Sequence, residues 1–384
     1  MPTRDLASYF VGTILPAAII AWLGGWLVRR WAPQFGLIDR PNARKVHTTP
    51  IPLGGGLAIA AGVLVPFAIG FAVLSQAKSL ETMLPQLVVV HGDGIWSQGR
   101  TLGLLLGSAL VLCLLGLADD FRGVDWRLRL LVQFGVAAVC VIFVPQLRLS
   151  AFLELPWLTN AFSVLWIVAL VNAFNMLDNM DGLSAGVAAL AGTFLAAVLL
   201  ISPNPESPHP QIFVAGLLLV LVGSLLGFLP HNQPPARLFM GDAGSYFLGF
   251  VIAVASLLAS YTGYRGTTQH AILAPVFVLA VPWYDLLSVI IIRLRQGRSP
   301  FDADKNHFSH RLVELGFTKP QAVQMIYLVT VICGLAAILL HRVDRAGAGI
   351  LVGILLCLFA FVAMLEATAR RTLRNRIGDE TKRK

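Results

Sequence analysis

Long apolar runs alternate with short polar segments along the whole chain. Eleven of these runs are close to the roughly 20 residues that a transmembrane helix needs, and they lie at 8–28, 54–75, 101–118, 128–145, 161–178, 183–201, 211–230, 245–262, 271–292, 322–340 and 347–367. A further apolar stretch at 84–90 is too short to cross a bilayer, so we expect it in a loop. The pattern predicts an all-α polytopic membrane protein with about 11 transmembrane helices, forming a single integral membrane domain over residues 1–384.

The composition supports this interpretation. Of the 384 residues, 57% are hydrophobic and 13% are charged, whereas soluble domains contain about 25% charged residues. An ordinary soluble enzyme is therefore excluded. All four cysteines lie inside apolar runs, where a small buried side chain is the usual role, so neither a disulfide framework nor zinc chemistry is indicated.

The distribution of positive charge predicts the orientation in the membrane. With eleven spans, the loops fall into two sets that contain 22 and 7 of the 29 Lys and Arg residues. Because Lys and Arg collect in cytoplasmic loops, the first set is expected in the cytoplasm, together with the basic tail at 368–384. The net charge of +9 thus reflects membrane topology, and no nucleic acid partner is predicted.

Acidic residues gather on the predicted cytoplasmic side, at the ends of three separate spans. Asp119 and Asp120 end the third span, Asp178 and Asp181 end the fifth, and Asp242 lies just before the eighth. Crowded carboxylates repel one another unless they share a cation, and Mg²⁺ or Mn²⁺ prefers such oxygen ligands. Since Mg²⁺ completes its shell with water and substrate phosphates, the pattern favours a phosphate-bearing substrate over simple helix caps or solvated loop residues.

A polar stripe runs along the end of the fifth span. Asn172, Asn175 and Asp178 recur every three residues, which keeps them within an arc of about 120° on a helix. Polar groups at this depth usually face the bundle interior or a water-filled cleft. Hydrogen bonding between helices is the alternative role for each asparagine.

The last large loop of the cytoplasmic set is basic. If its second half is helical, His307, His310 and Arg311 share one face, and an anion-binding surface for phosphate or nucleotide would combine them with Arg293, Arg295, Arg298 and Lys305. Zinc binding is disfavoured, because zinc sites usually need three or four ligands and only Asp302 and Asp304 lie nearby. A plain juxtamembrane basic loop is the remaining alternative.

Two further features lie at or within spans. The segment KVHTTPIPLGGG (45–56) enters the second span through a glycine cluster, which either permits tight packing or offers a helix N-terminus to phosphate; Lys45 and His47 favour the second interpretation. Asp285 lies about two turns inside the ninth span, where an ionisable residue is a functional candidate. The sequence indicates no specific role for it.

Together these motifs resemble the polyprenyl-phosphate N-acetylhexosamine-1-phosphate transferases, in the WecA/TagO-type branch related to MraY. LADDFRGVD is similar to the paired-Asp motif, with Asp125 where the MraY branch has Lys, and NAFNMLDNMDGLSAG, FMGDAGS and HFSHR match three further motifs in the same order. Two positions depart from the family pattern. Asn179 replaces a glycine, and Ser309 replaces the central histidine of the His motif.

The resemblance implies transfer of a sugar 1-phosphate, most commonly GlcNAc-1-phosphate, from a UDP-sugar to undecaprenyl phosphate, with release of UMP. It implies that Asp242 and Asp120 hold Mg²⁺ and that Asp119 positions or deprotonates the lipid phosphate, with an aspartyl-phosphate intermediate as the rival mechanism. Asn175, Asp178 and Asp181 would line the nucleotide pocket, and His307, His310 and Arg311 would contact diphosphate or sugar. The expected setting is the bacterial inner membrane, with a cytoplasmic active site serving O-antigen, teichoic acid or another envelope polymer, and a homodimer is the suggested assembly.

The sequence is compatible with three alternatives. A cation-coupled transporter also uses intramembrane acids, but it places them near the midplane and often in internal repeats, which this chain lacks. An MraY-like enzyme acting on UDP-MurNAc-pentapeptide is disfavoured by Asp125 and by the HFSHR sequence. A non-catalytic homologue would explain Ser309 and Asn179, although the predicted metal and base residues are intact.

Overall fold

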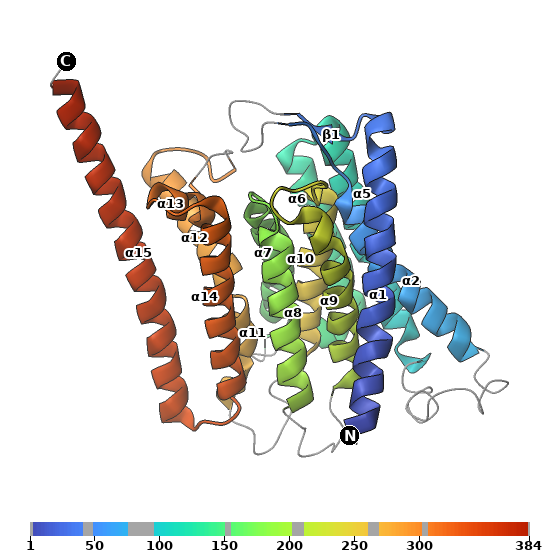
Figure 1. Cartoon of the computed structure of the whole chain (residues 1–384). Helices are drawn as coiled ribbons and strands as arrows, with labels where there is room; N and C mark the ends of the chain where they lie inside the picture. Colours follow the sequence, from blue (N-terminus) through green and yellow to red (C-terminus); the bar gives the residue numbers. More distant parts are fainter. Residues whose placement is uncertain are drawn as a thin grey trace. The chain divides into compact units, whose positions relative to one another are not determined.

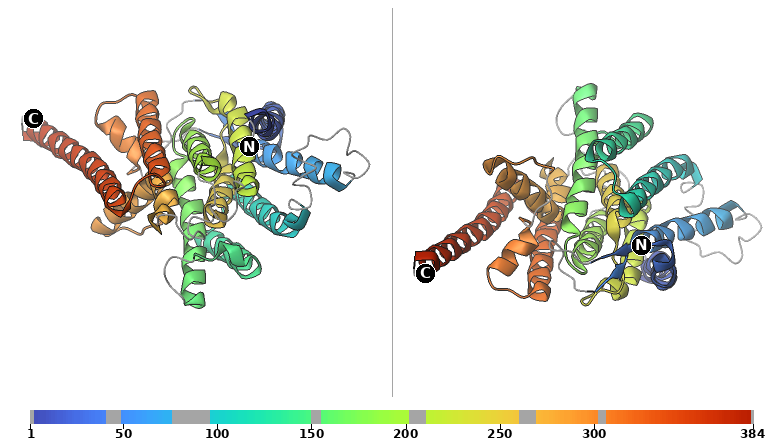
Figure 2. Two further views of the ribbon diagram at one scale, coloured as in Figure 1. Left: turned by 90° about the horizontal axis from the view of Figure 1, so that it is seen from below. Right: turned by 90° about the horizontal axis from the view of Figure 1, so that it is seen from above.

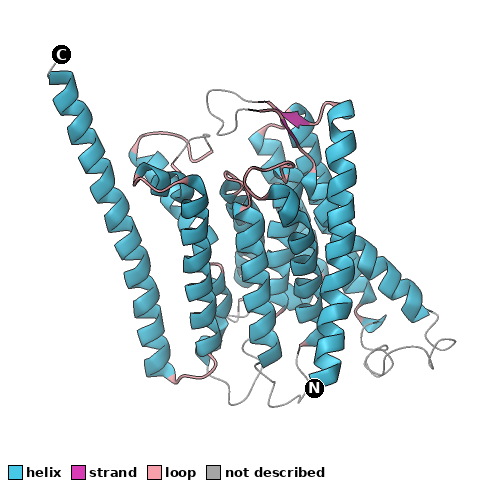
Figure 3. Cartoon of the chain, in the orientation of Figure 1, coloured by secondary structure: helices cyan, strands magenta, loops and turns pink. Residues whose placement is uncertain are grey.

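The computed structural model describes residues 3–40, 49–75, 96–149, 155–201, 211–259, 269–301 and 306–382. These residues are almost entirely helical, which confirms the predicted fold class (Figures 1 and 3). The two-residue strands β1 (Ile38–Asp39) and β2 (Ile51–Pro52) pair antiparallel, and the described part of the chain contains no other strand. The chain divides into two compact units, Met1–Ser260 and Tyr261–Lys384.

The helices of the first unit correspond to the first eight predicted spans. They are α1 (Thr3–Trp31), α2 (Gly55–Ser75), α5 (Gly99–Arg122), α6 (Trp126–Phe143), α7 (Pro156–Leu177), α8 (Leu183–Ile201), α9 (Ile212–Asn232) and α10 (Gly241–Leu258), with the 3₁₀ turns η1 (Ala32–Phe35) and η2 (Pro145–Leu147). One boundary needs correction. Helix α10 begins at Gly241 and not at 245, so Asp242 lies in its first turn and not ahead of it.

Helix α10 is the centre of the first unit. It packs against α2, α5, α7, α8 and α9, and the views in Figure 2 place these neighbours around it. Residues 243–256 of α10 are all buried. A helix that is apolar all round belongs in the interior of a bundle, and here that interior helix brings Asp242 to the ends of its neighbours.

Glycines let two neighbours approach the first turn of α10 very closely. A Cβ atom at Gly56 of α2 would overlap the backbone of Gly244, and a Cβ atom at Gly116 of α5 would overlap the backbone carbonyl of Asp242. The N–H groups of Gly55 and Gly56 donate to the carbonyls of Phe239 and Met240, both at 2.9 Å. The glycine cluster therefore packs against α10, and these two N–H groups are not available to phosphate.

The second unit contains the remaining predicted spans. Its elements are η3 (Gln269–Leu273), α11 (Ala274–Val278), α12 (Ala280–Arg295), α13 (Phe308–Glu314), α14 (Lys319–Leu339) and α15 (Arg345–Lys382). Helix α15 continues well beyond the expected end at 367, so most of the basic tail is helical.

The predicted ninth span, 271–292, is not one straight helix. Its two parts, His270–Val278 and Ala280–Arg295, meet at an angle of 68°. The break is explained by Pro282, because a proline ring clashes with the carbonyl four residues earlier, here that of Val278. Ten helices in the described ranges are long and apolar enough to cross a membrane, or eleven if the bent pair is one span, in agreement with the expected number.

Candidate active site

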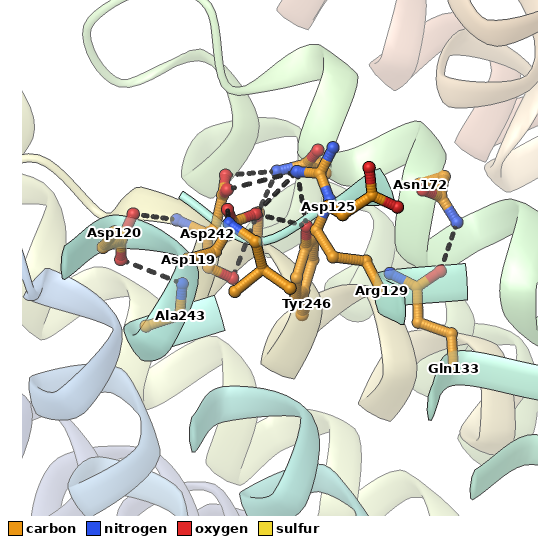
Figure 4. A network of polar contacts seen from close by, with 12 residues as sticks. Asp119, Asp120, Asp125, Arg129, Gln133, Asn172, Asp242, Ala243 and Tyr246 are labelled. Carbon is orange, nitrogen blue, oxygen red and sulfur yellow. Dashed lines mark hydrogen bonds and ion pairs between the residues drawn. The ribbon is translucent and has the colours of Figure 1, made fainter. Parts of the chain in front are cut away.

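Carboxylates from two helices meet at the first turn of α10 (Figure 4). Asp119 and Asp120 lie in the last turn of α5, and the carboxylate of Asp120 accepts hydrogen bonds from the N–H groups of Asp242 (2.9 Å) and Ala243 (3.2 Å). The first N–H groups of a helix have no partner within the helix and attract negative charge. Asp120 thus caps α10 from the neighbouring helix α5.

Gly241 permits this capping contact. Its φ of +70° lies in the left-handed region that favours glycine, and a Cβ atom there would lie 2.5 Å from Oδ2 of Asp120. The glycine that precedes Asp242 is therefore required by the position of the Asp120 carboxylate.

Asp119 is held on both of its oxygens. Oδ1 accepts the N–H of Val124 at 2.6 Å, and Oδ2 accepts Nη1 of Arg129 at 2.6 Å. The hydroxyl of Tyr246 donates to the same Oδ2 at 3.3 Å and accepts from Nη1 of Arg129 at 3.3 Å. Nη1 also lies 3.8 Å from Oδ2 of Asp242. One guanidinium therefore bridges the carboxylates of Asp119 and Asp242.

Neither Arg129 nor Tyr246 was among the site residues expected from the sequence. Each lies a short helical distance beyond a recognised motif: Tyr246 follows Asp242 by four residues on α10, and Arg129 lies in the first turns of α6, whose N-cap is Asp125. The i, i+4 spacing to Asp242 was the available signal for Tyr246.

Asp125 itself accepts the N–H of Arg127 at 2.9 Å, so its role in the structure is to cap α6.

The asparagines of the predicted polar stripe have different partners. Nδ2 of Asn175 donates to Oδ1 of Asp242 at 2.6 Å and to Oγ of Ser245 at 3.0 Å, so Asn175 belongs to the carboxylate cluster. Nδ2 of Asn172 donates to Oε1 of Gln133 on α6 at 2.6 Å and to its own helix at Val168 O. The structure thus places Asn172 in a hydrogen bond between helices, one turn away from the cluster.

Asp178 and Asp181 flank the turn that follows α7. Asp178 occupies the C-cap position, and burial together with the negative charges of Asp120 and Asp181 raises its pKa to about 8. Oδ2 of Asp181 accepts the N–H of Ala236 at 3.0 Å, which ties the turn to the segment before α10. Asn179, one of the departures from the family pattern, donates from Nδ2 to the carbonyl of Met176 at 2.8 Å and leaves the turn intact.

The cluster includes side chains that a ligand can reach. The side chains of Asp242 and Arg129 are 31% and 30% exposed, whereas that of Asp119 is 7% exposed. Within the described ranges, no three His, Cys, Asp or Glu side chains form a ready-made metal centre. Mg²⁺ needs only one or two carboxylates when substrate phosphates complete its shell, so an accessible Asp242 fits such an ion.

In the second unit, His307 is bound to the intramembrane acid Asp285. The Asp285 side chain is fully buried; its Oδ2 lies 3.0 Å from Nδ1 of His307, and its Oδ1 accepts the N–H of Phe308 at 2.6 Å. His307 is the N-cap residue of α13, and its ring centre lies 6.4 Å from that of His310. The expected helix in this loop is present, although it begins after His307.

The buried arginines of this loop contact other residues of the second unit. Arg311 donates from Nη2 to Oγ of Ser288 at 2.8 Å and from Nη1 to the carbonyl of Asn306 at 3.0 Å, and its Nε forms an ion pair of 3.1 Å with Oε1 of Glu366. Arg293 is also buried and donates to the carbonyl of Pro300. Both therefore contribute to the architecture of the loop, whereas Arg295 and Arg298 are exposed.

Some expected residues fall elsewhere. Ser309 is fully buried, so the central position of the His motif faces the interior of the second unit. Lys45, His47, Asp302, Asp304 and Lys305 lie outside the described residues.

The first unit is thus a bundle of apolar helices with an acidic site at the end of α10, as in an integral membrane enzyme that handles phosphates. Residues 102–260 match the model of glycosyl transferase family 4. The chain is 33% identical, over 86% of its length and 84% of the relative, to the probable undecaprenyl-phosphate N-acetylglucosaminyl 1-phosphate transferase of Bacillus subtilis.

Two further relatives are named as the same kind of transferase. The chain is 35% identical to a decaprenyl-phosphate N-acetylglucosaminephosphotransferase of Mycobacterium tuberculosis, over 85% of this chain and 80% of the relative. It is 29% identical to the undecaprenyl-phosphate alpha-N-acetylglucosaminyl 1-phosphate transferase of Escherichia coli K12, with the same coverage. The chain belongs to glycosyl transferase family 4, and the resemblance found in its motifs is confirmed.

Proposed function

We propose that this protein transfers GlcNAc-1-phosphate from UDP-GlcNAc to undecaprenyl phosphate, forming undecaprenyl-diphosphate-GlcNAc and UMP at the cytoplasmic face of a bacterial membrane. The observation that carries the proposal is the cluster in which Arg129 bridges Asp119 and Asp242 while Asn175 donates to Asp242. Both substrates bear phosphate, and catalysis of phosphoryl transfer consists mainly of positioning and charge stabilisation. The names of the B. subtilis and E. coli relatives agree with this reaction.

Asp242 is better suited than Asp119 to hold Mg²⁺, because its side chain is 31% exposed and that of Asp119 is 7% exposed. Asp120 would be the second ligand expected from the sequence, using lone pairs other than those that accept the N–H groups of Asp242 and Ala243. When bound, Mg²⁺ supplies charge neutralisation for the diphosphate.

Asp119 would position the lipid phosphate or accept its proton. Both of its oxygens already accept hydrogen bonds, from Val124 and Arg129, and its side chain is 7% exposed. These restraints favour a fixed base over a nucleophile that must move to form an aspartyl phosphate. Direct attack of the lipid phosphate on the β-phosphorus of the UDP-sugar is therefore the mechanism that we propose.

Arg129 would provide the positive charge in this site. Its contacts with Asp119, Tyr246 and Asp242 all run through Nη1. A guanidinium carries five N–H donors in a planar fork that suits phosphate, so Nε and Nη2 can serve a phosphate oxygen. Asp178 and Asp181 would contribute to the nucleotide pocket, and His307 and His310 would contact the diphosphate or sugar.

The test is UMP release by the purified full-length protein in detergent, with undecaprenyl phosphate, Mg²⁺ and a panel of UDP-sugars. We expect release with UDP-GlcNAc, its loss in EDTA, and a loss of about 10²- to 10³-fold in Asp242→Asn, the scale typical of removing one electrostatic stabiliser. Asp344→Asn is the matched control, because Asp344 accepts the backbone N–H of Gly347 at 2.9 Å and is not part of the carboxylate cluster. Folded protein that releases no UMP with any donor would overturn the proposal.

A further inference from the structure

Asp285 is an acid in a membrane-spanning segment whose surroundings explain its presence. Its carboxylate is fully buried on α12, where an unpartnered charge would be very unfavourable. Each oxygen has one partner: Nδ1 of His307 lies 3.0 Å from Oδ2, and the N–H of Phe308 lies 2.6 Å from Oδ1. The carboxylate thus contacts two consecutive residues of the His motif.

These contacts favour one tautomer of His307. Where the Asp285 carboxylate is the acceptor of this pair, Nδ1 of His307 is the donor. Nε2 is then the ring nitrogen that remains for another ligand, either with a lone pair or, in the imidazolium, with a second N–H. Carboxylates fix the tautomer and orientation of functional histidines in this way in many metal sites and catalytic triads.

A second anchor restrains the backbone around His307. The N–H of Phe308 begins α13, so the Asp285 carboxylate also lies at the N-terminus of that helix, where negative charge is favourable. One turn further along α12, Oγ of Ser288 accepts Nη2 of Arg311 at 2.8 Å. Two residues three positions apart on α12 therefore hold both ends of the HFSHR sequence.

We infer that Asp285 is a positioning residue, which holds His307 with Nδ1 protonated and leaves Nε2 for the diphosphate of the substrate. The choice of the diphosphate as the ligand of His307 rests on the proposed function. The pairing of Asp285 with His307 does not. Because Asp285 is fully buried, it acts through its two neighbours, the His307 ring and the N–H of Phe308, and not by contact with the substrate.

The pairing is tested without activity, by nitrogen NMR of ¹⁵N-histidine-labelled full-length protein in lipid vesicles. The His307→Ala variant assigns the His307 signals by difference. We expect a protonated Nδ1 in the unaltered protein and a reversed tautomer in Asp285→Asn. An asparagine side chain has one acceptor oxygen and one NH₂ donor. If its oxygen accepts the N–H of Phe308, its NH₂ group faces Nδ1 of His307, which must then be the acceptor.

Asp285→Asn is the informative variant because it preserves size and one acceptor for the start of α13. Asp344→Asn is its matched control, since Asp344 accepts a backbone N–H, that of Gly347 at 2.9 Å, and no histidine. The His307 signals should be the same in Asp344→Asn as in the unaltered protein. Unchanged His307 signals in Asp285→Asn would overturn the inference, whether or not the protein releases UMP.

Kinetics then test the positioning role. Loss of a residue that orients a functional histidine typically costs about 10- to 100-fold, and we expect this loss in kcat/KM for UMP release by Asp285→Asn. In a His307→Ala background, the same substitution should change kcat/KM less than about twofold, because no imidazole remains to be oriented. Independent, multiplying losses would show that Asp285 acts on activity by a route other than His307.

Discussion

The N–H of Asp242 donates to Oδ1 of Asp120 at 2.9 Å, so two acids that the family resemblance predicts as metal ligands are also joined by a structural hydrogen bond. Asp120 supports the helix that presents Asp242. The two residues should therefore respond differently to substitution.

For Asp120→Ala, we expect a loss of folding stability as well as activity, because the first N–H groups of α10 lose their acceptor. Loss of a helix cap costs about 0.5–2 kcal/mol. Asp242→Asn should lose activity with little change in stability. Thermal unfolding of both variants in detergent and EDTA checks this, and equal stability of the two would contradict the capping role.

Arg129→Ala should lower turnover by about 10- to 150-fold, the range that corresponds to about 1.5–3 kcal/mol for a hydrogen bond to a charged group. The substitution removes the cation that lies 2.6 Å from Asp119 and 3.8 Å from Asp242. Arg129→Lys should recover only part of the loss, since one ammonium cannot reproduce the planar fork.

Arg127→Ala is the matched control for Arg129. Arg127 is exposed on the same helix, and its guanidinium lies over the ring of Trp126. The turnover of the Arg127→Ala variant, measured by the same UMP assay, should be close to that of the unaltered protein. A comparable loss in both variants would mean that general positive charge on α6, and not the bridge, supports activity.

Tyr246→Phe should reduce kcat by about 2- to 12-fold, as expected for about 0.5–1.5 kcal/mol from a neutral hydrogen bond. The hydroxyl contacts both Asp119 and Arg129, each at 3.3 Å, so its removal loosens the pair without removing a charge. The control is Tyr9→Phe, in which the lost hydroxyl bonds the carbonyl of Ile212. That variant should lose stability but keep its kcat.

Asp178 gives a pH dependence whose sign follows from its pKa. Burial and the charges of Asp120 and Asp181 raise that pKa to about 8, so the folded chain binds a proton that the unfolded chain has already released at neutral pH. Folding stability from this group is thus present at low pH and is lost as pH rises toward and through about 8. Asp178→Asn cannot lose this proton.

The unfolding temperature of the unaltered protein should accordingly fall relative to that of Asp178→Asn between about pH 4 and about pH 8, and the difference should level off above about pH 8. Both proteins are compared in detergent with EDTA, so that no divalent cation compensates the charge. A difference that stays constant, or that grows in the opposite direction, would rule out an elevated pKa for Asp178.

The sequence alone predicts much of this molecule, because apolar runs of the length of a bilayer have few alternatives. It also places Asp119, Asp120 and Asp242 at helix ends, and the structure brings them together. It does not identify Arg129 and Tyr246, since their contact joins residues 117 positions apart and depends on how α6 packs near α10.

Other contacts are also not predictable from the sequence, because they join residues on different helices. The sequence shows that Arg311 is basic, but its burial depends on Ser288 and Glu366, which come from two other helices. The break at Pro282 was visible as a proline within an apolar run, yet a proline within a span is compatible with a kink or a continuous helix. Asp285 was recognisable as unusual, whereas its partner His307 lies 22 residues later in the chain.

The glycines at the crossing of α2, α5 and α10 have a consequence for the position of Asp242. Gly56 of α2 and Gly116 of α5 lie directly against the backbone of Gly244 and Asp242, with no room for a Cβ atom between them. The position of the first turn of α10, and with it that of Asp242, is therefore set by backbone contacts with α2 and α5. A single added methyl group at Gly56 or Gly116 would collide with the backbone of α10 and displace Asp242 without altering one acidic residue.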